Sequence, residues 1–398
     1  MQFSINRQAF IKSLNDVARA ISSRTTIPIL TNIKIVLSED ELILTGSNSD
    51  ISIETRIEQS DTTAQLVIKE KGGITLPATF FANIVKNLPA DDLMLAVDGL
   101  RANITSGASA FTINGQDVRN YPQLPEMDDV QSLSVSAAQL IDIISQTKIS
   151  ASTQESRPIL TGIHLALNGN DVKAVTTDSH RLSQRIVTLT GTEAHVSADV
   201  IIPAKSFNEL QSLLEGQDRV DIKLSANQAV FDLGHTTFYS RLLEGNYPET
   251  DRLIPTESTT ELTMDAGALL GAINRASLLS HESRNNVVQL TLKAGVATLT
   301  GTSQEVGQVQ EELVTKSVAG EDLEISFNPD YVRDALRVFS GKPVDVKFTS
   351  NLRPFTLTPA GETDNKQLQL ITPVRTFYLL IGVLNNFIDN QTLMLKTA

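Results

Sequence analysis

The densest cluster of side chains capable of chemistry is the run Thr177-Asp178-Ser179-His180-Arg181-Leu182. A serine beside a histidine and an aspartate raises the possibility of a hydrolase triad. Neighbours in an extended chain, however, point to opposite faces, whereas a general base must reach its nucleophile at about 3 Å. Three interpretations remain open: a hydrolase that uses Ser179 and His180, a polar strand end with turn hydrogen bonds, or one side of a binding surface.

The sequence contains no pattern typical of a metal, cofactor or nucleotide site. It has no cysteine, and its histidines form neither an i, i+4 pair nor a His-Glu-x-x-His motif, so we expect no zinc site. Ser340-Gly341-Lys342 lacks the upstream glycine of a phosphate-binding loop and is followed by Pro343. We therefore expect neither a metal nor a cofactor.

Length and composition predict a globular protein of about three domains, each with its own core. The chain has 398 residues, of which 41% are hydrophobic and 20% charged. The start Met1 to Asn6 lacks a signal peptide, and the run Tyr378 to Leu384 is far shorter than the roughly 20 residues that cross a bilayer. We expect a cytoplasmic protein with no membrane span. Its net charge of −13 repels nucleic acid, so any DNA contact must be local.

The elements that position the polar cluster follow a simple order of strand, helix and strand meander. Phe3 to Ile5 predicts a short strand, and Asn6 is suited to cap a helix that runs to about Ile21. Apolar residues from Phe10 onward recur at the spacing of one buried helix face. Three strand-like runs follow, at Ile33 to Leu37, Glu41 to Gly46 and Ile51 to Ile57.

This order returns along the whole chain. Blocks that begin near Phe3, Leu133 and Leu262 are separated by about 130 residues, and each block contains two half-units. Pro28-Ile29-Leu30-Thr31 of the first block matches Pro158-Ile159-Leu160-Thr161 of the second. The pattern predicts an α+β fold of three similar domains, each built from two helix-plus-antiparallel-sheet half-units.

The predicted helices are mildly basic although the chain is acidic. A surface lined by these helices would tolerate phosphate and attract DNA without reading bases. For any single cation, the alternative is an ordinary solvated helix face. The cations of this group are Arg7, Lys12, Arg19, Lys86, Lys205 and Arg275.

Several words of the sequence together resemble one family, the bacterial sliding clamp or β subunit of DNA polymerase III, from Met1 to Phe377. The words that carry the resemblance are Arg24 with Pro28-Ile29-Leu30, Arg157 to Gly162, Thr177 to Leu182, Asn246-Tyr247-Pro248, Phe327 to Tyr331, and Ile371-Thr372-Pro373-Val374-Arg375. The resemblance implies a DNA clamp fold that forms a ring as a head-to-tail homodimer around double-stranded DNA. It implies no enzymatic activity, and as partners the replicative DNA polymerase, a clamp loader and other proteins that carry a clamp-binding motif.

The resemblance also implies site residues and domain boundaries. Arg24 and Gln154 are expected to contact DNA. The domains are expected at residues 1–125, 126–255 and 256–377, with an atypical extension at 378–398. The pocket for a short partner peptide is expected to comprise Leu160, Thr177, His180, Arg181, Leu182, Pro248, Arg252, Leu253, Asn328, Tyr331, Leu352, Pro373, Val374 and Arg375.

The extension after Phe377 departs from the family pattern, in which the chain stops soon after Pro373-Val374-Arg375. Three explanations remain open: an artefact, a true extension, or a tail that occupies the pocket. Gln391 to Leu395 loosely resembles the docking peptide of the family, which is the basis of the third explanation.

Overall fold

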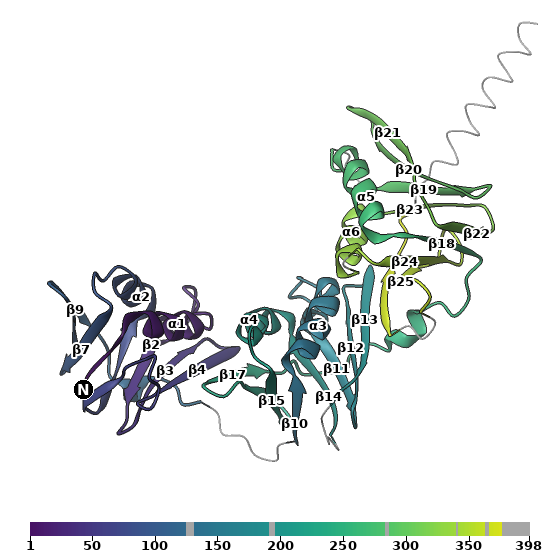
Figure 1. Ribbon diagram of the computed structural model, residues 1–398. Helices are drawn as coiled ribbons and strands as arrows, with labels where there is room; N and C mark the ends of the chain where they lie inside the picture. Colours follow the sequence, from purple (N-terminus) through teal and green to yellow (C-terminus); the bar gives the residue numbers. More distant parts are fainter. Residues whose placement is uncertain (125–130, 191–195, 283–285, 340, 363–365, 376–398) are drawn as a thin grey trace, which may run out of the picture. The chain divides into compact units, whose positions relative to one another are not determined.

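The computed structural model describes residues 1–124, 131–190, 196–282, 286–339, 341–362 and 366–375. Within these ranges there are six α-helices, and each directly follows a strand (Figure 1). The sheets are antiparallel throughout the described strand pairs for which a register is given. The predicted α+β fold built from strand-helix half-units is therefore confirmed. None of the helices in these ranges is both long and apolar enough to cross a membrane.

The elements fall into three successive repeats. The first contains β1 (Gln2–Asn6), α1 (Arg7–Ala18), η1 (Pro28–Thr31), β2 (Asn32–Leu37), β3 (Glu41–Ser47), β4 (Ile51–Glu58), β5 (Val67–Glu70), β6 (Gly72–Pro77), α2 (Ala78–Lys86), β7 (Asp92–Asp98), β8 (Arg101–Ser106), β9 (Ser109–Asn114) and η2 (Val118–Asn120). The second contains β10 (Gln131–Ser136), α3 (Ala137–Thr147), η3 (Lys148–Ser150), η4 (Pro158–Thr161), β11 (Gly162–Asn168), β12 (Asp171–Thr177), β13 (Arg181–Thr188), β14 (Ser197–Pro203), α4 (Ala204–Leu214), β15 (Arg219–Leu224), β16 (Gln228–Asp232), β17 (Thr236–Arg241) and η5 (Thr250–Leu253). The third contains β18 (Thr260–Asp265), α5 (Ala266–Ser280), β19 (Val288–Lys293), β20 (Val296–Ser303), β21 (Gly307–Glu312), β22 (Ser317–Gly320), β23 (Leu323–Phe327), α6 (Pro329–Val338), β24 (Pro343–Phe348), β25 (Phe355–Pro359) and β26 (Gln367–Ile371).

The chain divides into two compact units that do not coincide with the repeats. Unit 1 comprises residues 1–144, 154–174 and 187–247, and unit 2 comprises 145–153, 175–186 and 248 onward. Unit 1 holds a five-stranded sheet, β5-β1-β7-β8-β9, and an eight-stranded sheet, β10-β15-β16-β17-β4-β3-β2-β6. The pairing of β17 with β4 joins the first two repeats in one sheet.

Unit 2 is built from the third repeat and a hairpin of the second. Its larger sheet runs in the order β13-β26-β25-β24-β18-β22, and its smaller, four-stranded sheet runs β21-β20-β19-β23. Arg181 of β13 pairs with Ile371 of β26, and Arg185 pairs with Gln367. The run from Thr177 to Leu182 therefore lies in the same unit as Pro373 to Arg375, which the sequence places almost 200 residues later.

Helix α1 illustrates why these elements form and where they end. The side chain of Asn6 accepts hydrogen bonds from the N–H groups of Gln8 and Ala9, which satisfies donors at the helix start. Phe10, Leu14 and Val17 are buried on one face, as predicted. The helix ends at Ala18, so the predicted end near Ile21 is wrong. The next residues continue with tighter i to i−3 hydrogen bonds, a common form of the last turn.

Each repeat packs its first helix closely against a strand, and the second repeat does so differently. In β3 and β20, Gly46 and Gly301 lie under the helix, where an added Cβ would overlap a carbonyl oxygen of α1 or α5. The corresponding residue of β12 is Thr176, whose hydroxyl donates to the carbonyl of Thr147 at the end of α3, at 2.5 Å. Close approach is thus permitted by glycine in two repeats and by a buried hydrogen bond in the other.

Candidate docking site

The polar cluster at Thr177 to Leu182 forms the tight turn between β12 and β13. Oδ1 of Asp178 accepts from the N–H groups of His180, at 2.9 Å, and Arg181, at 3.0 Å. The hydroxyl of Thr177 donates to the carbonyl of Arg181 at 2.7 Å and accepts from the N–H of Ser179 at 3.2 Å. Ser179 adopts a positive φ of 80° at the tip of the turn. Asp178 and Thr177 therefore serve the turn itself, in the manner of an Asx turn.

The side chain of Arg181 is held between two elements of unit 2. Its Nε donates to Oδ2 of Asp178 at 2.9 Å, and its Nη1 donates to Oδ2 of Asp334 on α6 at 2.8 Å. The guanidinium carbon lies 4.7 Å from the centre of the Tyr331 ring. The His180 ring is nearly parallel to the same tyrosine, at 6.3 Å and 16°. Charge and ring contacts together fix the guanidinium over α6.

Helix α6 supplies a network of ion pairs and hydrogen bonds beside this arginine. Asp330 accepts from Arg333 at 2.8 Å, from His281 at 3.1 Å and from Asn286 at 2.7 Å. Asp334 lies 3.7 Å from Arg337 on the next turn, in addition to its bond with Arg181. Burial is the largest cause that raises the pKa of the adjacent Tyr331 hydroxyl, and nearby carboxylates raise it further, whereas the charge of Arg181 lowers it.

The segment after β26 completes the arrangement. Thr372 donates to the carbonyl of His180 through its backbone N–H, at 2.9 Å, and through its hydroxyl, at 2.8 Å. The N–H of Val374 donates to the carbonyl of Ser326 in β23 at 2.8 Å. Pro373 and Val374 remain partly exposed between these anchor points, and Arg375 is exposed. The segment is therefore fixed by its backbone while its side chains stay accessible.

The remaining residues predicted for the pocket differ in exposure. Leu253 of η5 is 50% exposed and Leu352 is 60% exposed, so both present apolar surface. Asn328 caps α6 by accepting from the N–H of Asp330. Pro248 and Arg252 are exposed, and Arg252 pairs with Glu249 at 2.9 Å. All predicted pocket residues lie in unit 2 except Leu160, which lies in unit 1.

Three predicted pocket residues are largely inside the protein. Leu160 is 5% exposed, Thr177 7% and Leu182 1%. Thr177 and Leu182 flank the turn from within the sheet, so they support its shape more than they enlarge its surface. Asp334 and Asp330, which hold the site together, were not predicted. Their spacing is the signal in the sequence: Asp330 and Asp334 are four residues apart, so they share one face of the helix.

The residues predicted to contact DNA lie on helices or on loops beside them. Lys12, Lys86, Arg24 and Gln154 are exposed. Among the described residues, no carboxylate lies within ion-pair distance of the first three of these. Arg7 instead donates to the carbonyl of Lys86 at 3.2 Å, which joins the start of α1 to the end of α2.

Three other predicted cations are already paired with carboxylates. Arg19 lies 3.5 Å from Glu209, and Lys205 lies 3.4 Å from Glu155. Arg275 donates to Glu311 from both Nε and Nη2, at 2.8 and 2.5 Å. A paired cation presents less net charge to its surroundings, so these three residues offer less positive charge than their number alone predicts. In the described ranges, no cluster of three or more potential ligands could hold a metal ion.

Comparison with known proteins identifies matches along the described chain. Family models of the DNA polymerase III β subunit match in three parts: the N-terminal domain at residues 1–125, the central domain at 134–249 and the C-terminal domain at 251–375. The chain is 44% identical to the beta sliding clamp of Streptococcus pneumoniae, over 94% of this chain and 100% of the relative. It is 42% identical to that of Staphylococcus aureus, over 95% of this chain and 100% of the relative.

Solved structures give the same result. The DNA polymerase sliding clamp of Bacillus subtilis matches with a TM-score of 0.91 and 42% identity, covering 95% of this chain and all of that one. A sliding clamp from Pseudomonas aeruginosa bound to griselimycin matches with a TM-score of 0.87 and 28% identity, over 94% of this chain and all of that one. The chain therefore belongs to the DNA polymerase III β-subunit family, the bacterial sliding clamps, which are non-catalytic subunits of the polymerase.

Proposed function

We propose that two copies of this chain form a ring that encircles double-stranded DNA and tethers the replicative polymerase and other partners through a peptide-docking surface. The observation that carries the proposal is the turn at Thr177 to Arg181, fixed against α6 and beside Pro373 to Arg375. The hydrolase alternative is not retained, because the family is non-catalytic and Asp178, the carboxylate beside Ser179 and His180, accepts from the backbone of its own turn.

The docking surface combines exposed apolar groups with fixed polar ones. Leu253, Leu352, Pro373 and Val374 supply apolar contact area in unit 2. Arg181 supplies orientation, because its guanidinium is held rigidly by side chains of two elements. Affinity from apolar anchors and orientation from a few polar groups is the usual division of roles in a peptide site.

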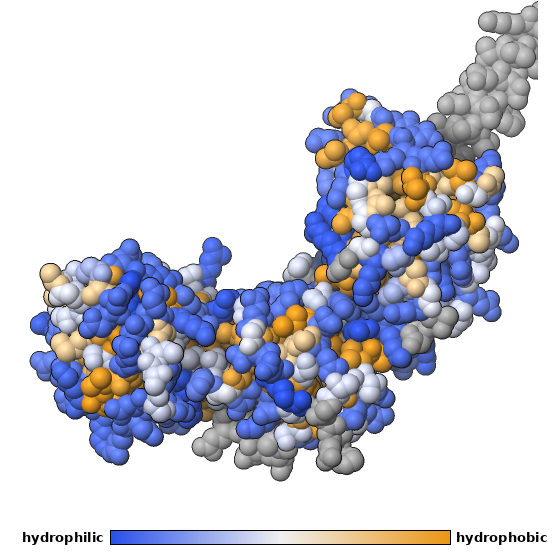
Figure 2. Space-filling model, in the orientation of Figure 1, coloured by the Kyte–Doolittle hydropathy of each residue, from blue (hydrophilic) through white to orange (hydrophobic). Residues whose placement is uncertain are grey.

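Two sheet edges support the proposed homodimer. Strand β9 is outermost in the five-stranded sheet of unit 1, and β21 is outermost in the four-stranded sheet of unit 2. An outermost strand offers unpaired backbone groups that can bind a strand of another copy. Phe80 and Phe111 are exposed in unit 1, and Leu278 and Val306 in unit 2. Figure 2 shows hydrophobic residues gathered at the end of unit 2 that carries α5 and β21.

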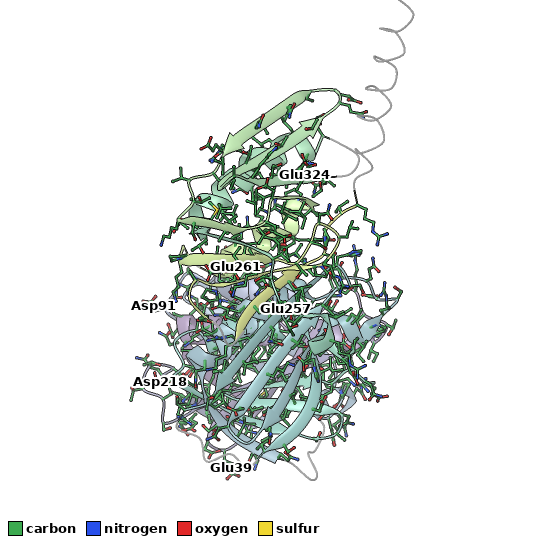
Figure 3. All side chains as sticks on the ribbon, turned by 90° about the vertical axis from the view of Figure 1, so that its right-hand side faces the viewer. Glu39, Asp91, Asp218, Glu257, Glu261 and Glu324 are labelled. Atoms are coloured by element: carbon green, nitrogen blue, oxygen red, sulfur yellow. The ribbon has the colours of Figure 1, made fainter. Side chains whose placement is uncertain are left out.

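The distribution of charge supports DNA on the helix side. Helices α1, α2 and α4 lie on one side of unit 1 (Figure 1). In unit 2, Glu257, Glu261 and Glu324 lie on the sheet side, which faces the viewer in Figure 3. An acidic protein can still hold DNA in this way, because a closed ring needs no tight grip on phosphate and sliding requires that no base be held.

We further propose three domains, at residues 1–125, 126–255 and 256–377, and a clamp loader that opens the ring. The three family-model ranges support the number of domains and the first boundary, while the C-terminal model begins at residue 251, slightly before the proposed second boundary. The extension at 378–398, with its motif at Gln391 to Leu395, lies outside the described residues. A titration of a Gln- and Leu-containing peptide into the full chain and into a chain ending at Phe377 tests the tail hypothesis, and equal affinities would exclude it.

Retention on circular DNA tests the ring directly. The protein, loaded onto a nicked circle by a clamp loader, should stay bound at salt concentrations that remove surface binders, and should leave when the circle is cut. Light scattering should give the mass of a dimer. A monomer at micromolar concentration, or equal retention on circular and linear DNA, would refute the proposal.

A further inference from the structure

The internal repeats contain a second copy of the docking turn without its function-bearing side chains. In unit 1, Oδ1 of Asn48 accepts from the N–H groups of Asp50, at 2.8 Å, and Ile51, at 2.9 Å. The N–H of Arg241 donates to the carbonyl of Asp50 at 2.9 Å. These bonds repeat those of Asp178 and Thr372 around the docking turn. The backbone of the turn is therefore common to both hairpins.

The side chains around the two turns differ sharply. Ile51, which is 6% exposed, occupies the position of Arg181. On α4, Ser206 and Glu209 stand where α6 carries Tyr331 and Asp334. Asn48 replaces Asp178 and keeps the turn without a charge. What distinguishes the docking turn is the group of a guanidinium, a ring and two carboxylates.

The charge of Arg181 is compensated twice by its own protein. Asp178 and Asp334 each accept one of its N–H groups. Among the described residues, its Nη2 has no acceptor. A neutral carbonyl or amide oxygen of a partner can accept from Nη2 at little electrostatic cost. A partner carboxylate at Nη2 would meet Asp178 and Asp334, which are bonded to the same guanidinium. Asp334 also lies 3.7 Å from Arg337 and 4.0 Å from Arg333, but both cations are farther from it than Arg181 is. Like-charge repulsion from the two carboxylates therefore offsets part of the attraction.

We propose that Asp334 is a specificity-determining positioning residue of the docking site. It holds Arg181 over Tyr331 and makes the site favour a neutral oxygen over a carboxylate at the partner position that faces Arg181. The inference rests on the proposed docking function. Asp178 shares the charge but also forms the turn, whereas Asp334 lies on α6 and can be changed without altering the turn.

The test is a peptide scan by fluorescence anisotropy with the full chain. The probe is a synthetic peptide that contains Gln and Leu/Phe, and each of its positions is replaced in turn by Gln and by Glu. With the unchanged protein, one position should favour Gln. Asp334→Asn keeps an oxygen for Nη1 but loses the charge, so that preference should fall by about two- to fivefold. Asp334→Ala should reduce the preference and also weaken both peptides.

A matched control and the refuting results separate charge from fold. Glu305→Gln removes an exposed carboxylate of unit 2 and should leave the preference unchanged. Far-UV circular dichroism checks that each variant is folded. Asp334→Glu keeps the negative charge, so it should retain the Gln preference that Asp334→Asn reduces. If the peptides bind but Asp334→Asn and Asp334→Ala both keep the Gln preference, this inference is wrong and the docking function stands. If no peptide binds the unchanged protein, the docking function itself is refuted.

Discussion

A buried chain of hydrogen bonds behind the docking turn allows a quantitative prediction. The hydroxyls of Ser150 and Ser183 are 2.6 Å apart, and Ser183 donates to Oε1 of Gln369 at 2.5 Å. The amide nitrogen of Gln369 donates to the carbonyl of Gln146 at 3.0 Å. Ser150, Ser183 and Gln369 are each no more than 1% exposed. The chain joins the end of α3 to β13 and β26.

Gln369→Leu conserves volume but leaves the Gln146 carbonyl and one serine hydroxyl hydrogen without a partner. At about 1–2 kcal/mol for each such buried group, we expect a loss of about 2–4 kcal/mol in the free energy of unfolding. Ser183→Ala leaves a similar number of buried polar groups without a hydrogen-bond partner. The double variant leaves no more buried groups without a partner than either single variant does, so it should be about as stable as either. The coupling energy should therefore be about as large as one single loss, about 2–4 kcal/mol.

Urea unfolding followed by far-UV circular dichroism measures these differences, with the transition of unit 2 compared between variants. Thr358→Val is the matched control, because its buried hydroxyl has no hydrogen-bond partner among the residues that the structure describes, and its removal should be neutral or stabilising. Strictly additive losses in the double variant would refute the view that Ser183 and Gln369 act as one network.

Three further predictions follow from other parts of the molecule. Gly301→Ala should destabilise unit 2 by about 1–3 kcal/mol in thermal unfolding, because its Cβ would overlap a helix carbonyl, and more than Gly271→Ala in α5, whose Cβ would meet only the movable end of Arg275. The hydrogen bond with Arg275 lowers the pKa of Glu311, so the pair stabilises the folded protein at pH values above the ordinary glutamate pKa. This stability is lost as the pH falls through the pKa of Glu311 in the folded protein. Glu311→Gln should therefore flatten the acid limb of an unfolding titration. Lys12→Ala should lower the salt dependence of DNA retention, reducing the slope of log K against log salt concentration by up to about 0.9. The effect of Arg275→Ala should be smaller, because that charge is already paired with Glu311.

Local signals in the sequence account for the elements that were predicted well. The N-cap side chains of Asn6, Asp265 and Asn328 each accept from the first turn of a helix, and the helix starts follow from them. The repeated Pro-Ile-Leu-Thr words form matching 3₁₀ turns, η1 and η4. Short-range chemistry of this kind can be read from a few neighbouring residues.

The features that were missed depend on residues far apart in sequence. Asp334 acts on Arg181 across 153 positions, and Gln369 acts on Ser183 across 186. Strand β5 (Val67–Glu70) was not predicted, because its burial is low and its pairing with β1 supplies most of its order. The assignment of the turn at Thr177 to unit 2 likewise follows from the partner of β13, which no local pattern reveals.

The pairing of β13 with β26 has a consequence for the protein during its synthesis. Residues 181–185 are synthesised well before their sheet partner at 367–371 and the anchor at Thr372, which follow almost 200 residues later. Until then β13 has only β12 beside it, Ser183 lacks Gln369 as its acceptor, and Pro373 and Val374 have not been added. Only a chain translated through residue 375 can form the proposed docking surface, so a shorter product would not compete with longer molecules for a partner peptide.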